Sequence, residues 1–263
     1  MIGAISSKQV CELLYRTCLL VGDTAMPRRC ASCQLGLQSS HQRGGLDGFL
    51  CRACQALVLY SPDIRCERCG LNLGPRPQAF GWTHCRHCRP QIADNPPHKL
   101  DCVVCCDYTV PFDQWITRLK YGKAHGMARF LGHWLARKTQ QAAIQQPDVL
   151  IPVPCSADKL KQRGYNQAAL IARHAGRVLQ RPVHTDWLLK TNEAGAQAEL
   201  GREERLKNLL GAFRATRPVP SHIRIGLVDD VMTTGATLQS CVAALEKAGA
   251  NSIVLMAVCR TPE

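Results

Sequence analysis

Residues 224–237 read RIGLVDDVMTTGAT, and this stretch decides the fold of the surrounding chain. An apolar run ends in two adjacent acids, Asp229 and Asp230, and then passes into a short, hydroxyl-rich loop around Gly235. The residues that follow, up to about Lys247, have the apolar spacing of a helix. The stretch therefore predicts a buried strand, a tight loop and a helix, in that order.

The same alternation extends along the C-terminal two thirds of the chain. Strands that alternate with helices are typical of a mostly parallel sheet flanked by helices, with ligands at the carboxyl ends of the strands. We expect an α/β fold of this kind, in which Cys102, Cys105 and Cys106 are apolar residues of the first strand rather than metal ligands. The expected strands are 102–108, 148–153, 186–190, 224–229 and 252–259, and the expected helices are 112–120, 125–140, 166–179, 202–208 and 236–248.

The loop has the chemistry to bind a sugar phosphate. The first amides of a helix lack partners within the helix and lie at the positive end of its dipole, so they attract phosphate. The hydroxyls of Thr233, Thr234 and Thr237 add donors, and the two acids can accept hydrogen bonds from vicinal ribose hydroxyls. An ordinary strand-to-helix turn is the alternative, but two acids followed by small and hydroxyl-bearing residues have no packing purpose there.

The charge of the chain is strongly positive. Its 263 residues carry 33 Lys and Arg against 20 Asp and Glu, which gives a formal net charge of +13. With 46% apolar residues the chain can bury a core, so disordered and collagen-like classes are excluded. The charge favours polyanionic partners such as nucleic acids or phosphorylated small molecules, although it could also serve solubility alone.

Half of the 16 cysteines form four Cys-x-x-Cys pairs between residues 30 and 88. Two such pairs can surround one ion with four thiolates, which is typical of a structural zinc site, and two Zn²⁺ ions are therefore expected. Consecutive and interleaved pairings both satisfy the spacing, and structural disulfides or idle thiols are the alternative to metal. We interpret His84 and His87 as polar neighbours of Cys85 rather than as ligands. The predicted ligands are Cys30, Cys33, Cys51, Cys54, Cys66, Cys69, Cys85 and Cys88.

Three segments follow from this organisation. Residues 5–20 are apolar but are interrupted by Lys8, Glu12 and Arg16, so they predict an amphipathic helix within residues 1–25 rather than a transmembrane segment or a secretory leader. Residues 26–95 form the expected double zinc ribbon, and the Pro-Pro break at 96–97 precedes the expected α/β domain, 98–263. The expected compartment is the cytoplasm, where thiols stay reduced.

Several motifs together resemble a known family. Residues 224–237 are similar to the phosphoribosyl-pyrophosphate (PRPP) binding motif of type I phosphoribosyltransferases. The ComF family is indicated by IPVP at 151–154, RGYNQ at 163–167 and LKYG at 119–122, together with the cysteine pairs. The pattern of Gln197, Leu200, Arg205, Asn208 and Phe213 also fits, and the resemblance covers about residues 26–260. It implies a type I phosphoribosyltransferase-like domain preceded by a zinc-ribbon domain.

The resemblance also implies roles for individual residues. Asp229 and Asp230 would hold the ribose 2′- and 3′-hydroxyls, and Mg²⁺ would accompany PRPP, held chiefly by ligand oxygens. A loop over residues 191–207 would bring Arg202 and Arg205 to the pyrophosphate, although the same residues could form a salt-bridged surface helix. The expected PRPP-binding residues are Val228, Asp229, Asp230, Val231, Thr233, Thr234, Gly235, Ala236, Thr237, Cys155, Ser156, Lys159 and Arg163.

Three functions remain open from the sequence. The first is handling of single-stranded DNA during natural transformation, alongside other DNA-uptake proteins. The second is a metabolic phosphoribosyltransferase that releases pyrophosphate on transfer to an unknown base or amine, and the third is a regulatory protein that senses PRPP. Basic and aromatic residues that would contact a DNA strand are Arg52, Arg68, Trp82, Arg86, Lys120, Tyr121 and Lys123.

Overall fold

The computed structural model describes residues 29–37, 49–59, 64–74, 81–89, 99–122, 125–191 and 212–262. The chain forms two compact units, Met1–Gln55 and Ala56–Glu263, and the boundary between them in the sequence falls within α2 (Arg52–Leu59). The predicted N-terminal helix, the predicted helix 202–208 and the Pro-Pro boundary all lie outside the described residues, as do Arg202, Arg205 and Lys123. The three-segment division therefore stays a prediction.

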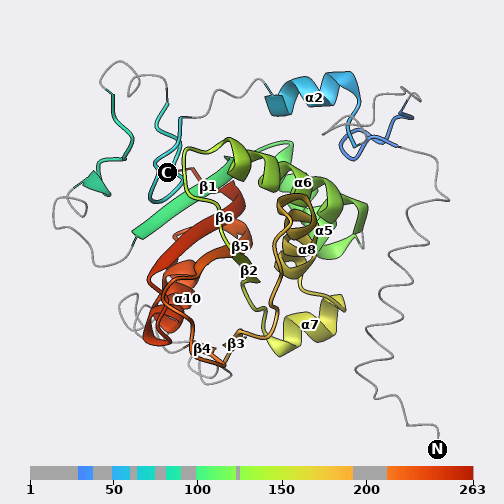
Figure 1. Ribbon diagram of the computed structural model, residues 1–263. Helices are drawn as coiled ribbons and strands as arrows, with labels where there is room; N and C mark the ends of the chain where they lie inside the picture. The colour runs from blue at the N-terminus through green and yellow to red at the C-terminus, as the bar shows by residue number, and fades with distance from the viewer. Residues whose placement is uncertain are drawn as a thin grey trace, which may run out of the picture. The chain divides into compact units, whose positions relative to one another are not determined.

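A four-stranded parallel sheet forms the centre of the second unit (Figure 1). Its order is β1 (Lys99–Asp107), β6 (Ser252–Arg260), β5 (Arg224–Met232) and β2 (Val149–Pro152), and each neighbouring pair is parallel. β5 and β6 are central and read as nearly continuous apolar runs, as strands covered on both faces do. The expected fold class, a parallel sheet flanked by helices, is confirmed.

Helices cover both faces of the sheet (Figure 1). α6 (His125–Gln141) and α8 (Gln167–Leu179) contact each other and the sheet strands. α10 (Ala236–Lys247) contacts the hairpin of β3 (Leu188–Lys190) and β4 (Phe213–Ala215), and its apolar residues share a core with β5 and β6. α5 (Phe112–Tyr121) packs on α6 through edge-to-face aromatic contacts, among them Trp115 with Phe130 at 5.3 Å between ring centroids. The described helices include none that is long and apolar enough to cross a bilayer.

Three described elements have no counterpart among the predictions. One is α2, a helix of eight residues within the segment expected to form only the zinc ribbon. α7 (Ala157–Arg163) buries none of its residues, so it carries no apolar periodicity. It is defined by its ends instead, where Ser156 Oγ accepts a hydrogen bond from Lys159 N and Gly164 adopts φ of 79°. β4 has only three residues, too few for an alternating pattern. The other predicted strands and helices of the described part agree with the structure to within a few residues, and the cysteines at 102, 105 and 106 lie in β1 as expected.

Candidate functional sites

The first unit contains a group of four cysteines, Cys30, Cys33, Cys51 and Cys54, whose Sγ atoms all lie within 4.8 Å of one another. Cys33 Sγ and Cys51 Sγ are 3.7 Å apart, and Cys51 N donates a hydrogen bond to Cys30 Sγ. Thiolates placed tetrahedrally at about 2.3 Å around a zinc ion are about 3.8 Å from each other, so this spacing fits a bound metal ion. Cys54 lies in α2, and Cys51 is the residue directly before this helix. The pair therefore lies at a helix start, where the helix dipole favours thiolates.

The second unit contains an equivalent group, Cys66, Cys69, Cys85 and Cys88, in which Cys69 Sγ and Cys85 Sγ are again 3.7 Å apart. The pairing of the Cys-x-x-Cys motifs is thus consecutive rather than interleaved. Neither histidine of this region belongs to the group. His84 Nδ1 is hydrogen-bonded to Thr83 Oγ1, and His87 Nε2 accepts from Arg86 Nε. Both cysteine groups can hold a structural metal ion.

The first knuckle of each group has the same local structure. Cys30 N donates to Leu35 O, and Cys66 N donates in the same way to Leu71 O. The residue after the second cysteine is left-handed in both, with φ of 64° at Gln34 and 69° at Gly70. The difference in residue type follows from packing, because a Cβ at Gly70 would lie 2.3 Å from Val104 Cγ2. A glycine is required where the knuckle packs directly on β1.

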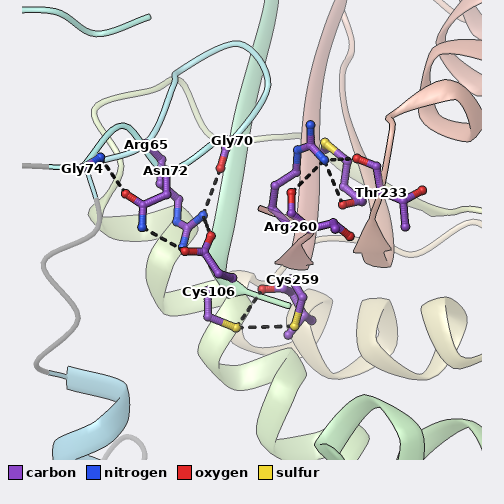
Figure 2. A network of polar contacts seen from close by, with 12 residues as sticks. Arg65, Gly70, Asn72, Gly74, Cys106, Thr233, Cys259 and Arg260 are labelled. Atoms are coloured by element: carbon purple, nitrogen blue, oxygen red, sulfur yellow. Dashed lines mark hydrogen bonds and ion pairs between the residues drawn. The ribbon is translucent and has the colours of Figure 1, made fainter. Parts of the chain in front are cut away.

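This second cysteine group is fastened along the outer edge of β1 (Figure 2). Cys102 N donates to Glu67 O, and the Arg65 guanidinium forms an ion pair with Asp107 at 2.9 Å between Nη1 and Oδ1. Asn72 Nδ2 donates to the other carboxylate oxygen of Asp107, also at 2.9 Å. Unpaired edge strands invite aggregation, and the knuckle covers part of this edge and accepts a hydrogen bond from one of its amides.

The predicted acid pair lies at the carboxyl end of β5. Asp229 is partly exposed, whereas Asp230 is only 4% exposed. Asp230 Oδ2 lies 2.7 Å from Lys120 Nζ of α5, and Gln167 Nε2 of α8 donates to Oδ1 at 3.4 Å. Burial, and then repulsion by Asp230, raise the pKa of Asp229 well above its ordinary value, although Lys120 opposes them. The two acids are therefore unlike in environment.

Two motifs that are distant in the sequence converge on this pair. Tyr165 OH donates to Leu119 O, and Arg163 donates to both Tyr121 OH and Gln167 Oε1 at 3.2 Å. Asn166 begins α8 by accepting from two amides of its first turn, and its Nδ2 donates to Val153 O at the end of β2. The RGYNQ segment thus ties the end of α5, the start of α8 and the end of β2 together beside Asp230.

The predicted phosphate loop follows the acid pair. Gly235 is the N-cap of α10 with φ of 81°, and it supplies no side-chain cap, whereas Ser156 and Asn166 cap α7 and α8. Thr233 and Thr234 are exposed, and Thr234 Oγ1 accepts from Ala236 N at 3.4 Å. The N-cap of α10 therefore supplies no side-chain partner to the amides of the first turn, at the place where the sequence predicts a phosphate.

Two basic residues near this loop were missed by sequence reasoning. Arg260, 7% exposed at the end of β6, donates to the Met232 and Thr233 carbonyls and so holds the start of the loop (Figure 2). Lys190, at the end of β3, lies near Cys155. Burial raises the pKa of that thiol, and the charges of Arg163, Lys159 and Lys190 act in the opposite direction. Their signal was weak, since each is a lone cation at the end of an apolar strand.

The predicted nucleic-acid contacts fall in different places. Trp82 is 43% exposed and the Arg89 guanidinium lies 3.7 Å from its ring centroid. Arg86 is also exposed. Arg52 is exposed on α2, and Arg68 is partly buried in the second cysteine group. The structure places Lys120 against Asp230 instead, while the adjacent Tyr121 is 65% exposed.

These features define the class of protein that the sequence predicts. Cysteine groups precede a parallel sheet flanked by helices, and an acid pair at the end of a central strand leads into a helix that begins at a glycine. The chain belongs to the ComF family of competence proteins, because it is 30% identical over 231 residues to competence protein F of Haemophilus influenzae, covering 84% of this chain and 95% of that protein. It is also 27% identical to the DNA utilization protein YhgH of Escherichia coli strain K12, covering 90% and 98% of the two chains. Competence protein ComFC of Bacillus subtilis is 28% identical, with 79% and 82% covered.

Solved structures were also compared. The glutamine PRPP amidotransferase of B. subtilis aligns with a TM-score of 0.35 and 24% identity, covering 49% of this chain and 26% of that one. A purine phosphoribosyltransferase of Pyrococcus horikoshii aligns with a TM-score of 0.32 and 20% identity, covering 51% and 82%. No protein-family model matches the chain.

Proposed function

We propose that this ComF-family protein binds PRPP or a related phosphoribosyl ligand at residues 229–237, and that it handles single-stranded DNA during DNA uptake in the cytoplasm. One observation carries the first part. α10 begins at a glycine with positive φ and without a side-chain cap, directly after an acid pair at the end of a central strand. Such a helix start offers free amides to a 5′-phosphate, and the neighbouring acid offers an acceptor to the ribose hydroxyls.

The two kinds of metal ion in this proposal bind to different groups. Zn²⁺ suits both cysteine groups, because four thiolates close the coordination sphere and leave no position for a substrate. Mg²⁺ would enter with the ligand's pyrophosphate, since it prefers oxygen ligands and keeps several waters. Within the described residues the only groups of three or more metal-ligating side chains are the two cysteine sets.

The ligand proposal is tested by calorimetric titration of Mg²⁺ and PRPP into the full chain and into two glycine variants. Gly235→Ala places a methyl group in the phosphate loop, whereas Gly74→Ala adds one at a similar φ of 69° on the knuckle side, and each new Cβ has nothing within 4 Å. We expect tight binding by the wild type and by G74A, and at least a tenfold loss in G235A. Equal affinities in the three proteins would contradict the proposal. Pyrophosphate release with a panel of bases and amines separates turnover from binding alone.

The DNA proposal is supported by the exposed Trp82, which offers a stacking surface next to Arg89. The relatives named for DNA utilization and for competence also support it. We expect single-stranded DNA to bind with an affinity that falls steeply with salt, and Trp82→Ala to weaken binding by about five- to a hundredfold, the range of one lost base stack. Val110→Ala, a change at a residue 70% exposed, is the matched surface control. DNA binding that is unchanged in W82A would contradict the role of Trp82 as a stacking surface.

A further inference from the structure

The two acids at the end of β5 are not equivalent. Successive side chains of a strand point to opposite faces, so Asp229 and Asp230 face different neighbours. Asp230 is 4% exposed and both of its carboxylate oxygens are engaged, one by the Lys120 ammonium at 2.7 Å and the other by the Gln167 amide at 3.4 Å. Asp229 remains partly exposed, and its Oδ1 accepts a hydrogen bond from the backbone N–H of Asp230.

We propose that Lys120 is a positioning residue, whose ammonium balances the charge of the buried Asp230 and fixes its carboxylate, and that Asp229 is the acid that meets a ribose hydroxyl. This division of roles deepens the proposed ligand site and rests on it. It also revises the expectation from the sequence, in which both acids hold hydroxyls and Lys120 contacts DNA.

The energetic argument begins with burial. A carboxylate removed from water is costly unless a counter-charge and hydrogen bonds replace the lost hydration. Lys120 supplies the counter-charge, and its side chain is itself only 22% exposed. Burial opposes the charged form of Lys120, but Asp230, together with Tyr108 and Asp229, outweighs burial and raises the pKa of the ammonium. Each member of the buried pair therefore depends on the other.

The surrounding contacts leave Lys120 little freedom. Its two neighbours in α5 are both held from the RGYNQ segment, because Tyr165 OH donates to Leu119 O and Arg163 donates to Tyr121 OH. The same Arg163 donates to Gln167, which in turn donates to Asp230. A closed set of contacts thus fixes both the ammonium and the carboxylate. This arrangement explains why the LKYG and RGYNQ motifs accompany the acid pair although neither contains an acid.

The test compares Lys120→Met, Asp230→Asn, the double variant K120M/D230N and Asp229→Asn in the full, metal-loaded chain. The first measurement is the urea midpoint at neutral pH, which needs no ligand. K120M leaves a buried carboxylate without its counter-charge, so we expect a lower midpoint, and adding D230N should restore most of the loss. K120R, which keeps the charge, should stay close to the wild type. Effects of K120M and D230N that simply add would overturn the ion-pair role.

The second measurement is calorimetric binding of Mg²⁺ and PRPP by the same proteins. We expect K120M to lose at least tenfold in affinity, K120M/D230N to return to within about threefold of the wild type, and D229N to lose at least tenfold. A double variant that binds as poorly as D229N would show that Asp230 itself meets the ligand, and would overturn the division of roles. A wild type that binds no PRPP would overturn the proposed function and the role of Asp229, whereas the urea midpoints would still decide the role of Lys120.

Discussion

The packing of the second cysteine group on β1 gives a quantitative prediction for Gly70→Ala. An alanine Cβ at this position would lie 2.3 Å from Val104 Cγ2 and 3.1 Å from Cys102 Sγ, so the knuckle must move away from the strand. Overpacking of this kind costs about 1–3 kcal/mol. The left-handed backbone adds about 1–2 kcal/mol for a residue with a side chain. The total expected loss is about 2–5 kcal/mol.

Gly74 isolates the packing contribution. It has the same φ of 69°, but a Cβ there has nothing within 4 Å, so Gly74→Ala should carry only the backbone cost. The assay is hydrogen exchange at the Cys102 amide, whose acceptor is Glu67 O of the knuckle. An excess of 1–3 kcal/mol corresponds to exchange about 5–150 times faster in G70A than in G74A. Removing Val104 Cγ2 with Val104→Ala should abolish most of this difference.

Equal exchange at Cys102 in the two glycine variants would refute the reasoning, because the variants differ in the contact with Val104 and hardly at all in backbone strain. The structure supplies an internal check on that point. Gln34 occupies the equivalent position of the first knuckle with φ of 64°, so a side chain is compatible with the knuckle conformation itself.

Three further predictions concern the loop, the acid pair and the metal ions. Arg260→Met removes the donors to the Met232 and Thr233 carbonyls, so calorimetry should show at least tenfold weaker PRPP binding with unchanged zinc content, and unchanged affinity would contradict the role of Arg260. The pKa of Asp229 is raised in the folded state, so ionisation of this group lowers the free energy of unfolding as pH rises above the ordinary carboxyl range near about 4. This loss of stability is complete only above the raised pKa. Asp229→Asn should therefore raise the free energy of unfolding from urea titration by about 1 kcal/mol at pH 7, the size usual for relieved strain at a functional site, and have little effect near pH 4. The opposite pH trend would refute the prediction. Chelation should expose the knuckle around Cys66 to protease and speed exchange at Cys102, while amides of β5 stay protected, and loss of protection throughout the sheet would show that the metal stabilises the whole second unit.

The sequence predicted most of the sheet because its signals are local. The acid pair, the loop and α10 are contiguous, so their order and spacing survive in one stretch of residues. The apolar runs of β1 and β6 are likewise long enough to be recognised. α7 lacks an apolar face altogether, and it is defined only by a serine cap and a terminal glycine.

The environment of each site residue was harder to predict, because it depends on chain segments that are far apart. Lys120 and Asp230 form their ion pair across 110 positions, and nothing near Lys120 in the sequence indicates that it pairs with a buried carboxylate. The pairing of the cysteines was open for a similar reason, since the Cys-x-x-Cys spacing is the same in both arrangements. Only the positions of the Sγ atoms distinguish them.

The second cysteine group and the phosphate loop are attached to neighbouring strands at the same end of the sheet (Figure 2). Arg65 and Asn72 hold the knuckle to Asp107, the last residue of β1, while Arg260, the last residue of β6, holds the loop at Thr233. Asp107 and Arg260 are register partners, and one residue earlier Cys106 Sγ and Cys259 Sγ are 3.5 Å apart in the buried layer. Since parallel strands in a packed core shift together rather than singly, the knuckle and the loop share one rigid support. If the proposed ligand site is correct, the second cysteine group supports it by fixing the strand ends that carry it, without any cysteine having to reach the ligand.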